Sequence, residues 1–224
     1  MPLSVRISSP QDIFELLTAA LVLCCLLALV LAVVSNFATA THEERESRVR
    51  RSPVATGSMT AVLTTIGLLI GKRLDAVALP SLLWQDALMI VGLLLLVGGT
   101  VVNLLGRVQL GRNWANQATV YADQTLVTTG VFALVRHPLY ASLIWMSCGG
   151  ALIYRNVAAL LATLCVFVPM MIYRAGIEEE MLSAQFTEYA EYCRKVGRLM
   201  PRWHTLSYDR PSPPAPLPEE RGAG

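Results

Sequence analysis

Long apolar runs, each with at most one charged residue, alternate with short polar segments along most of this chain. The first three runs cover residues 13–37, 54–71 and 82–106, and charged loops separate them. A helix needs about 20 mostly apolar residues to cross the roughly 30 Å hydrocarbon core of a bilayer. We therefore predict three transmembrane helices in the N-terminal part, residues 1–106.

Two shorter apolar runs follow at 139–153 and 157–173, with only Tyr154-Arg155-Asn156 between them. So brief a polar break predicts a helical hairpin with a tight turn. Pro138 suits the first turn of a helix, because its missing N–H has no partner there in any case. The fourth helix should therefore begin near His137. The predicted fold class is all-α: an integral membrane bundle of about five transmembrane helices.

The C-terminal part is polar. From Met181 to Arg198, apolar residues recur at helical spacing, which predicts a cytoplasmic amphipathic helix. Residues 207–224 contain five prolines and no apolar pattern, so we expect a disordered tail. Residues 107–206 then form one unit made of a long polar loop, the hairpin and the C-terminal helix.

Composition agrees with a membrane protein. Hydrophobic residues make up 54% of the chain and charged residues only 15%, whereas soluble domains carry about 25% charged residues. Of the 18 Lys and Arg residues, four (Arg6, Lys72, Arg73 and Arg155) fall on one side of the predicted bundle and fourteen on the other. Because Lys and Arg are enriched in cytoplasmic loops, the N-terminus is predicted outside and the C-terminus in the cytoplasm.

Two classes of partner are not expected. Nucleic-acid binding needs a basic surface with a recognisable reading motif, and none is present. The five cysteines contain no CxxC pair and form no spaced framework, so we expect free thiols and no metal site. The expected surroundings are the lipid bilayer and a membrane-embedded substrate.

The candidate chemistry lies where the predicted hairpin meets the cytoplasmic side. Polar side chains next to a bilayer are expensive and usually functional. Tyr140 lies three residues beyond His137 and shares its helix face, and Arg174 and Glu178, four residues apart, also share a face. The hairpin would bring these groups together at one membrane edge. Arg136 alone is equally typical of a positive-inside anchor, and we interpret it so.

The surrounding motifs resemble the isoprenylcysteine carboxyl methyltransferase family of integral membrane enzymes. The similarity covers about residues 107–203. Its motifs are Leu110-Gly111-Arg112-Asn113-Trp114, Gln117, Gln124 to Phe132 with Leu126-Val127-Thr128-Thr129-Gly130 inside it, Arg136-His137-Pro138-Leu139-Tyr140, Arg174, Glu178-Glu179, Met181-Leu182, Phe186, Glu188-Tyr189, Glu191-Tyr192 and Arg198-Leu199-Met200-Pro201.

This resemblance implies S-adenosyl-L-methionine as cofactor, a pocket at the cytoplasmic membrane edge and a lipophilic methyl acceptor. The implied cofactor contacts are Gln117, Gln124, Thr125, Leu126, Val127, Phe132, His137, Pro138, Leu139, Tyr140 and Glu178. Arg174 is the implied catalytic residue, because the family places an arginine near the accepting carboxylate.

Three positions depart from the family pattern: Gln124 stands for a histidine, Phe132 for a tyrosine and Ser142 for a glycine. These departures bear more on the identity of the methyl acceptor than on the identity of the cofactor. A phospholipid amine or a small thiol is the alternative acceptor, and either would have to lose a proton to a base such as Glu179 or His137. An NADPH-dependent membrane reductase and a non-catalytic membrane protein are alternatives of another class.

Overall fold

The computed structural model describes residues 10–40, 47–49, 64–68, 82–111, 119–121 and 125–202. Most of the second predicted span, 54–71, lies outside these ranges, although residues 64–68 within it are helical. The predicted tail, 207–224, also lies outside them, as do Gln117 and Gln124.

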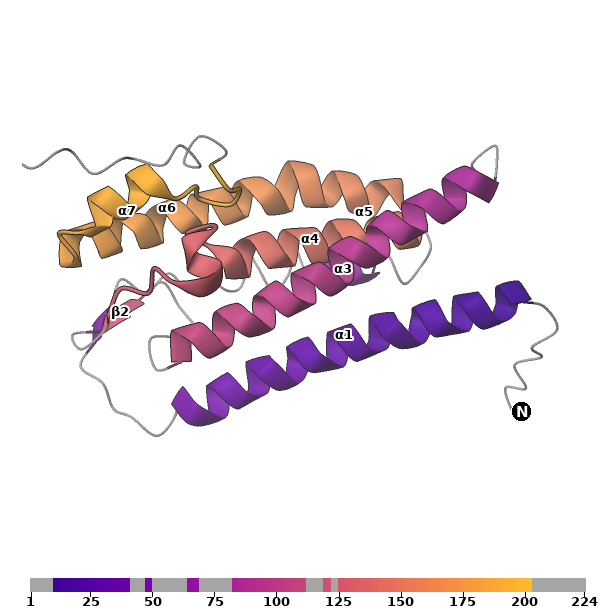
Figure 1. The fold of residues 1–224 in the computed structure, drawn as a ribbon, viewed down its shortest axis with the longest axis horizontal. Helices are drawn as coiled ribbons and strands as arrows, with labels where there is room; N and C mark the ends of the chain where they lie inside the picture. Colours follow the sequence, from indigo (N-terminus) through magenta and orange to yellow (C-terminus); the bar gives the residue numbers. More distant parts are fainter. Residues whose placement is uncertain are drawn as a thin grey trace, which may run out of the picture.

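Three helices in the described part of the chain are long and apolar enough to cross a membrane. The first two are α1 (Pro10–Ala40) and α3 (Leu82–Leu110), which lie side by side (Figure 1). The third runs from Val157 to Gln185 and comprises α5 (Val157–Ala162), the π-helical turn η3 (Thr163–Phe167) and α6 (Val168–Gln185). The π turn comes just before Pro169, whose ring nitrogen cannot donate to the preceding turn.

The predicted hairpin is present. Helix α4 (Pro138–Ile153), a shorter apolar helix, has His137 as its N-cap and Pro138 in its first turn. Arg155 takes a positive φ of 52° in the turn, and the Asn156 side chain caps the next helix by accepting from the Ala159 amide at 2.8 Å. The following helix extends past the predicted end at 173 as far as Gln185. Glu178, Glu179 and Glu180 therefore lie on the same helix as the apolar segment.

The all-α class is confirmed, with one short strand pair added, and the predicted C-terminal helix is corrected. The segment 181–198 is not one amphipathic helix: α6 ends at Gln185, Phe186 is extended, and α7 spans Tyr189–Lys195. The bundle also contains a short antiparallel pair of strands, β1 (Ser47–Val49) and β2 (Thr119–Tyr121). Strand β2 lies against α6 and pairs with β1, so the strand pair joins the bundle at α6.

Small residues bring α3 and α4 into close antiparallel contact. A Cβ added to Gly92 would lie 2.8 Å from the Gly149 carbonyl oxygen, and one added to Gly99 would lie 2.7 Å from Met146 Cγ. Such contacts are typical of transmembrane interfaces that need small side chains. Gly98 has no atom within 4 Å of an added Cβ and is not part of this interface.

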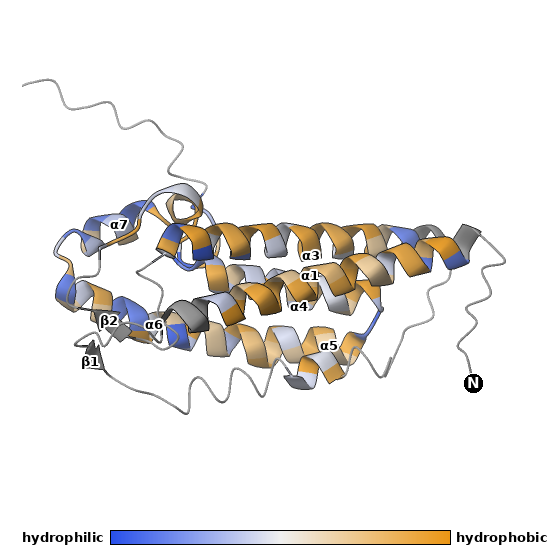
Figure 2. Ribbon diagram, turned by 90° about the horizontal axis from the view of Figure 1, so that it is seen from below, coloured by the Kyte–Doolittle hydropathy of each residue, from blue (hydrophilic) through white to orange (hydrophobic). Residues whose placement is uncertain are grey.

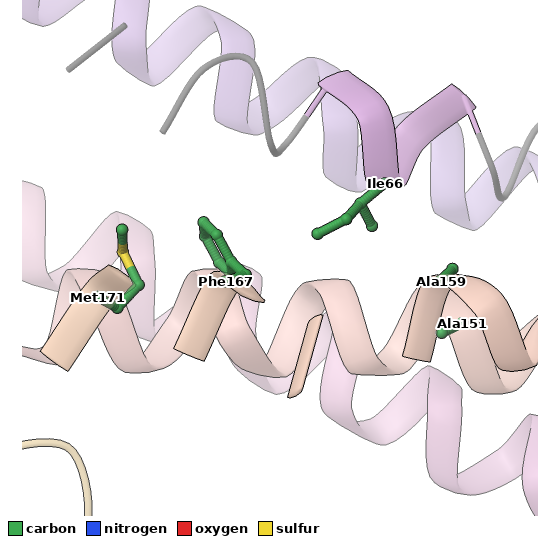
Figure 3. Packing of buried hydrophobic residues seen from close by; sticks show 5 residues of the cluster. All are labelled: Ile66, Ala151, Ala159, Phe167 and Met171. Atoms are coloured by element: carbon green, nitrogen blue, oxygen red, sulfur yellow. The ribbon is translucent and has the colours of Figure 1, made fainter. Parts of the chain in front are cut away.

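The apolar core lies between the hairpin and the helical turn 64–68. Its buried members are Ile66, Ala151, Ala159, Phe167 and Met171 (Figure 3).

The outer faces are apolar as well, with Leu17 62% and Leu31 67% exposed on α1. Polar residues gather instead at the end that carries α7 and the last turns of α6 (Figure 2). Apolar rods with one polar end identify an integral membrane protein.

Candidate functional site

The start of α4 meets the last turns of α6 at the polar end of the molecule. His137 and Tyr140 lie on one face of α4, with their rings stacked at a centroid distance of 5.5 Å and an interplanar angle of 7°. His137 Nδ1 is 3.5 Å from Glu178 Oε2 on α6. Helical spacing on α4 and the return of the hairpin therefore place the imidazole, the phenol and the carboxylate together.

Arg174 completes this group. Its Nε donates to the Tyr140 hydroxyl at 2.8 Å and lies 3.8 Å from Glu178 Oε1. The Tyr140 hydroxyl in turn donates to the Glu178 carboxylate. The guanidinium carbon lies 5.7 Å from the centroid of the Tyr140 ring, within the range of a cation–π contact. We call His137, Tyr140, Arg174 and Glu178 the α4–α6 cluster.

Glu179 forms a second group beside the first. Its Oε1 accepts from Arg136 Nη2 at 2.8 Å and from Arg198 Nε at 3.1 Å, and lies 3.2 Å from His137 Nε2. Only 12% of its side chain is exposed. A carboxylate held by two guanidinium groups is stabilised in its charged form. Glu179 is thus a partner for cations and a poor proton acceptor for a substrate.

Arg136 also binds the C-terminal segment to the start of α4. Arg136 Nη1 donates to the carbonyls of Cys193, at 3.0 Å, and Val196. The amides of Arg136 and His137 donate to the carbonyls of Gly197 and Arg198 at 2.8 and 3.0 Å. Our interpretation of Arg136 as a membrane anchor therefore omitted its main contacts, which join α4, α6 and α7.

The two glutamates set the charge state of His137. Burial lowers the pKa of this imidazole, but hydrogen bonds and charge from Glu178 and Glu179 outweigh burial, so its pKa is raised above 6.5. His137 is therefore more readily protonated than a free histidine, and its protonated form bridges both carboxylates.

The segment before α4 carries other predicted contacts. Residues 125–128 are irregular and lead into a 3₁₀ turn, η2 (Gly130–Ala133). The turn is fixed by the Val131 amide, which donates to Gln109 Oε1 of α3 at 2.9 Å, and by a positive φ of 62° at Gly130. Phe132 is buried and its carbonyl accepts from the Tyr192 hydroxyl at 2.6 Å.

The structure thus brings part of the predicted set together. His137, Tyr140, Arg174 and Glu178 contact one another, and Pro138 and Leu139 lie between the first two on α4. Thr125, Leu126, Val127 and Phe132 lie in the segment that leads into α4, and Gln117 and Gln124 lie outside the described residues. Sequence reasoning missed the pairing of Glu179 with Arg136 and Arg198. The only signal was a second glutamate beside Glu178.

Comparison with known proteins finds several methyltransferases that are similar to part of this chain. The sequence model of the phospholipid methyltransferase family matches residues 87–189. The protein-S-isoprenylcysteine O-methyltransferase of Saccharomyces cerevisiae is 30% identical over 111 residues, which are 48% of this chain and 46% of that protein. A probable protein-S-isoprenylcysteine O-methyltransferase of Oryza sativa subsp. indica is 29% identical over 158 residues, 68% of this chain and 83% of that protein.

A solved structure is also similar. It is that of the eukaryotic intramembrane Ras methyltransferase, an isoprenylcysteine carboxyl methyltransferase, with 25% identity and a TM-score of 0.48. The match covers 69% of this chain and 54% of that one. The chain thus spans about half the length of the yeast relative and of the solved structure.

Proposed function

We propose that this chain, whose resemblance to the isoprenylcysteine carboxyl methyltransferase family the comparisons confirm, is a membrane methyltransferase that uses S-adenosyl-L-methionine. The single observation that carries the proposal is the α4–α6 cluster at the polar end of an apolar bundle. Its ionisable groups come from helices far apart in sequence, and they lie within the segment that matches the methyltransferase family.

The residues of the cluster fit the cofactor chemically. S-adenosylmethionine carries an ammonium, a carboxylate, a sulfonium and an adenine. Glu178, whose side chain is 24% exposed against 6% for His137 and Arg174, is the most accessible charged group and would accept from the ammonium. The Tyr140 ring offers a face that attracts a cationic group, and the His137 ring stacked on it suits a planar group. When bound, the cofactor supplies a methyl group on an electrophilic sulfur.

Arg174 would orient the acceptor. Its Nε is fixed by the Tyr140 hydroxyl, and this bond fixes the plane of the guanidinium. A planar guanidinium suits a carboxylate, which it binds through two parallel hydrogen bonds. A carboxylate is already ionised near neutral pH, so no side chain has to remove a proton from it. The contribution of the protein is then orientation and exclusion of water.

A carboxylate on a lipophilic molecule, such as a prenylcysteine, is the acceptor we favour. It agrees with the names of the yeast and rice relatives, which are isoprenylcysteine O-methyltransferases. It also agrees with the engagement of Glu179 by Arg136 and Arg198, which leaves that carboxylate a weak base. A phospholipid amine is the second candidate, because the matching family model describes phospholipid methyltransferases.

Calorimetry with S-adenosylhomocysteine and with NADPH tests the proposal on the purified protein. We expect S-adenosylhomocysteine to bind and NADPH not to bind. Glu178→Ala and His137→Ala should each weaken binding about tenfold or more, the equivalent of one charge-assisted hydrogen bond. Glu180→Ala is the matched control, since Glu180 is exposed on the same helix.

Arg174→Ala should retain cofactor affinity and lose turnover. Binding of NADPH alone would favour a reductase, and binding of neither ligand would favour a non-catalytic membrane protein. Unchanged affinity in both Glu178→Ala and His137→Ala would place the cofactor elsewhere.

A further inference from the structure

A chain of buried hydrogen bonds crosses the interface between α3 and α4. Arg107 Nε donates to Asn103 Oδ1 at 2.8 Å, Asn103 Nδ2 donates to Ser142 Oγ at 2.8 Å, and Ser142 Oγ donates to the Leu139 carbonyl at 2.8 Å. Asn103 and Ser142 are both 0% exposed. The proposed reaction uses none of these groups.

The chain ends on the helical turn that carries the site. Leu139 lies between His137 and Tyr140 in sequence, and Ser142 follows two residues after Tyr140. Two residues turn an α-helix by about 200°, so Ser142 faces α3 while Tyr140 faces α6. The hydrogen-bond chain therefore supports the first turn of α4 from behind.

Close packing leaves this turn little freedom against α3. A Cβ added to Gly99 would lie 2.8 Å from the Ser142 carbonyl oxygen, and one added to Gly106 would lie 3.0 Å from Leu139 Cδ2. Gly99, Asn103 and Gly106 have the i, i+4, i+7 spacing of one helix face. Along that face Asn103 is the polar contact with α4, and its amide fixes the register of the two helices.

We infer that Asn103 is a positioning residue for the site, acting through Ser142 on the first turn of α4. The inference rests on the proposed function, because what Asn103 positions is His137 and Tyr140. The inference also assigns a role to Ser142, which stands where the family that the chain resembles commonly has glycine. Its hydroxyl accepts from the Asn103 amide and donates to the Leu139 carbonyl.

A hydrogen bond between membrane helices contributes little net stability on average. If Asn103 only joins two helices, Asn103→Ala should lower the unfolding midpoint and leave ligand binding normal. If Asn103 positions the site, Asn103→Ala should bind the ligand more weakly while the protein is still folded. The two accounts therefore differ in a quantity that can be measured well below the unfolding temperature.

The experiment measures the dissociation constant of S-adenosylhomocysteine and the thermal unfolding midpoint for five proteins in detergent. They are the wild type, Asn103→Ala, Ser142→Ala, the double variant and Thr100→Ala. Thr100 is the matched control, because it is also buried on α3 but its hydroxyl donates only to the Leu96 carbonyl of its own helix.

We expect Asn103→Ala and Ser142→Ala each to raise the dissociation constant roughly three- to tenfold, the range for one interhelical hydrogen bond. The dissociation constant of the double variant should not exceed that of the single variant that binds more weakly, because both changes break the same chain of hydrogen bonds. Thr100→Ala should bind normally. Ser142→Ala keeps the test decisive if Asn103→Ala does not fold.

Wild-type affinity in both single variants, with a lowered midpoint, would overturn the inference and leave Asn103 a purely structural contact. Additive losses in the double variant would also overturn it. Absence of binding by the wild type would instead overturn the proposed function itself.

Discussion

Glu179 is held by more charged partners than any other described carboxylate of the site. Arg136, Arg198 and His137 all approach it, and the Arg136 and Glu179 side chains are only 8% and 12% exposed. Removing one member of a buried ion group leaves the others uncompensated, which costs more than the group contributes when it is intact.

Glu179→Gln should therefore lower the free energy of unfolding by about 2–4 kcal/mol. Glu191→Gln is the control: Glu191 pairs with Lys195 on the exposed face of α7, and its loss should change stability little. Thermal unfolding in detergent measures both. Equal midpoints for the two variants would show that the buried ion group does not hold α7 to α4.

His137 gives stability a defined pH dependence. Burial lowers its pKa, but Glu178 and Glu179 raise the pKa by more than burial lowers it. The pKa in the folded protein therefore lies above 6.5. The stabilisation by the protonated imidazole is fully present below the unfolded pKa and is lost as pH rises through the raised folded pKa. The wild-type protein should therefore unfold at a higher temperature at about pH 6 than at about pH 9.

The matched variant is His137→Asn, which removes the titrating group. The difference between the two pH values should shrink in this variant. The same difference in both proteins would assign the pH dependence to another group.

At the residue scale, helical periodicity was enough to identify the α4–α6 cluster. His137 with Tyr140, and Arg174 with Glu178, share faces by spacing alone. The short break Tyr154-Arg155-Asn156 predicted that the helices return to one end. Spacing gives no partner for Glu179, because Arg198 lies beyond an irregular segment. That pairing depends on the three-dimensional path of the chain.

At the scale of elements, the contact between α3 and α4 places the site. Adjacent glycines on α3 offer a direct test. Gly99→Ala should destabilise by about 1–3 kcal/mol, because its Cβ meets Met146 and the Ser142 carbonyl. Gly98→Ala, with open space around its Cβ, should be neutral or gain up to about 1 kcal/mol from helix propensity.

The midpoint of thermal unfolding distinguishes the two glycine variants, and S-adenosylhomocysteine affinity reports whether α4 has moved. We expect only Gly99→Ala to bind more weakly. Equal stability of the two variants would contradict the close approach of α3 and α4.

The break between α6 and α7 shows where element prediction fails. Apolar residues keep helical spacing from Leu182 through Tyr189, so the pattern alone predicts one helix. Contacts far away in sequence hold α7 after the break: the Tyr192 hydroxyl donates to the Phe132 carbonyl, and Arg136 binds carbonyls at the end of α7. Strands β1 and β2 were missed for a related reason, since three-residue strands are too short to show alternation.

At the scale of the whole molecule, apolar rods end in a polar region where helices α4, α6 and α7 meet (Figure 2). A membrane enzyme with a lipophilic substrate and a water-soluble cofactor needs such a boundary. The orientation of this end remains a prediction: the excess of Lys and Arg places it in the cytoplasm.

We propose methyl transfer at the α4–α6 cluster. Transfer of a radiolabelled methyl group from S-adenosylmethionine tests this, with wild type and Glu178→Ala compared in proteoliposomes. Prenylcysteine, phospholipid amines and a small thiol serve as acceptors. We predict labelled product from prenylcysteine with wild type and at least a tenfold lower rate with Glu178→Ala. No label in any acceptor, or equal rates for the two proteins, would contradict the account.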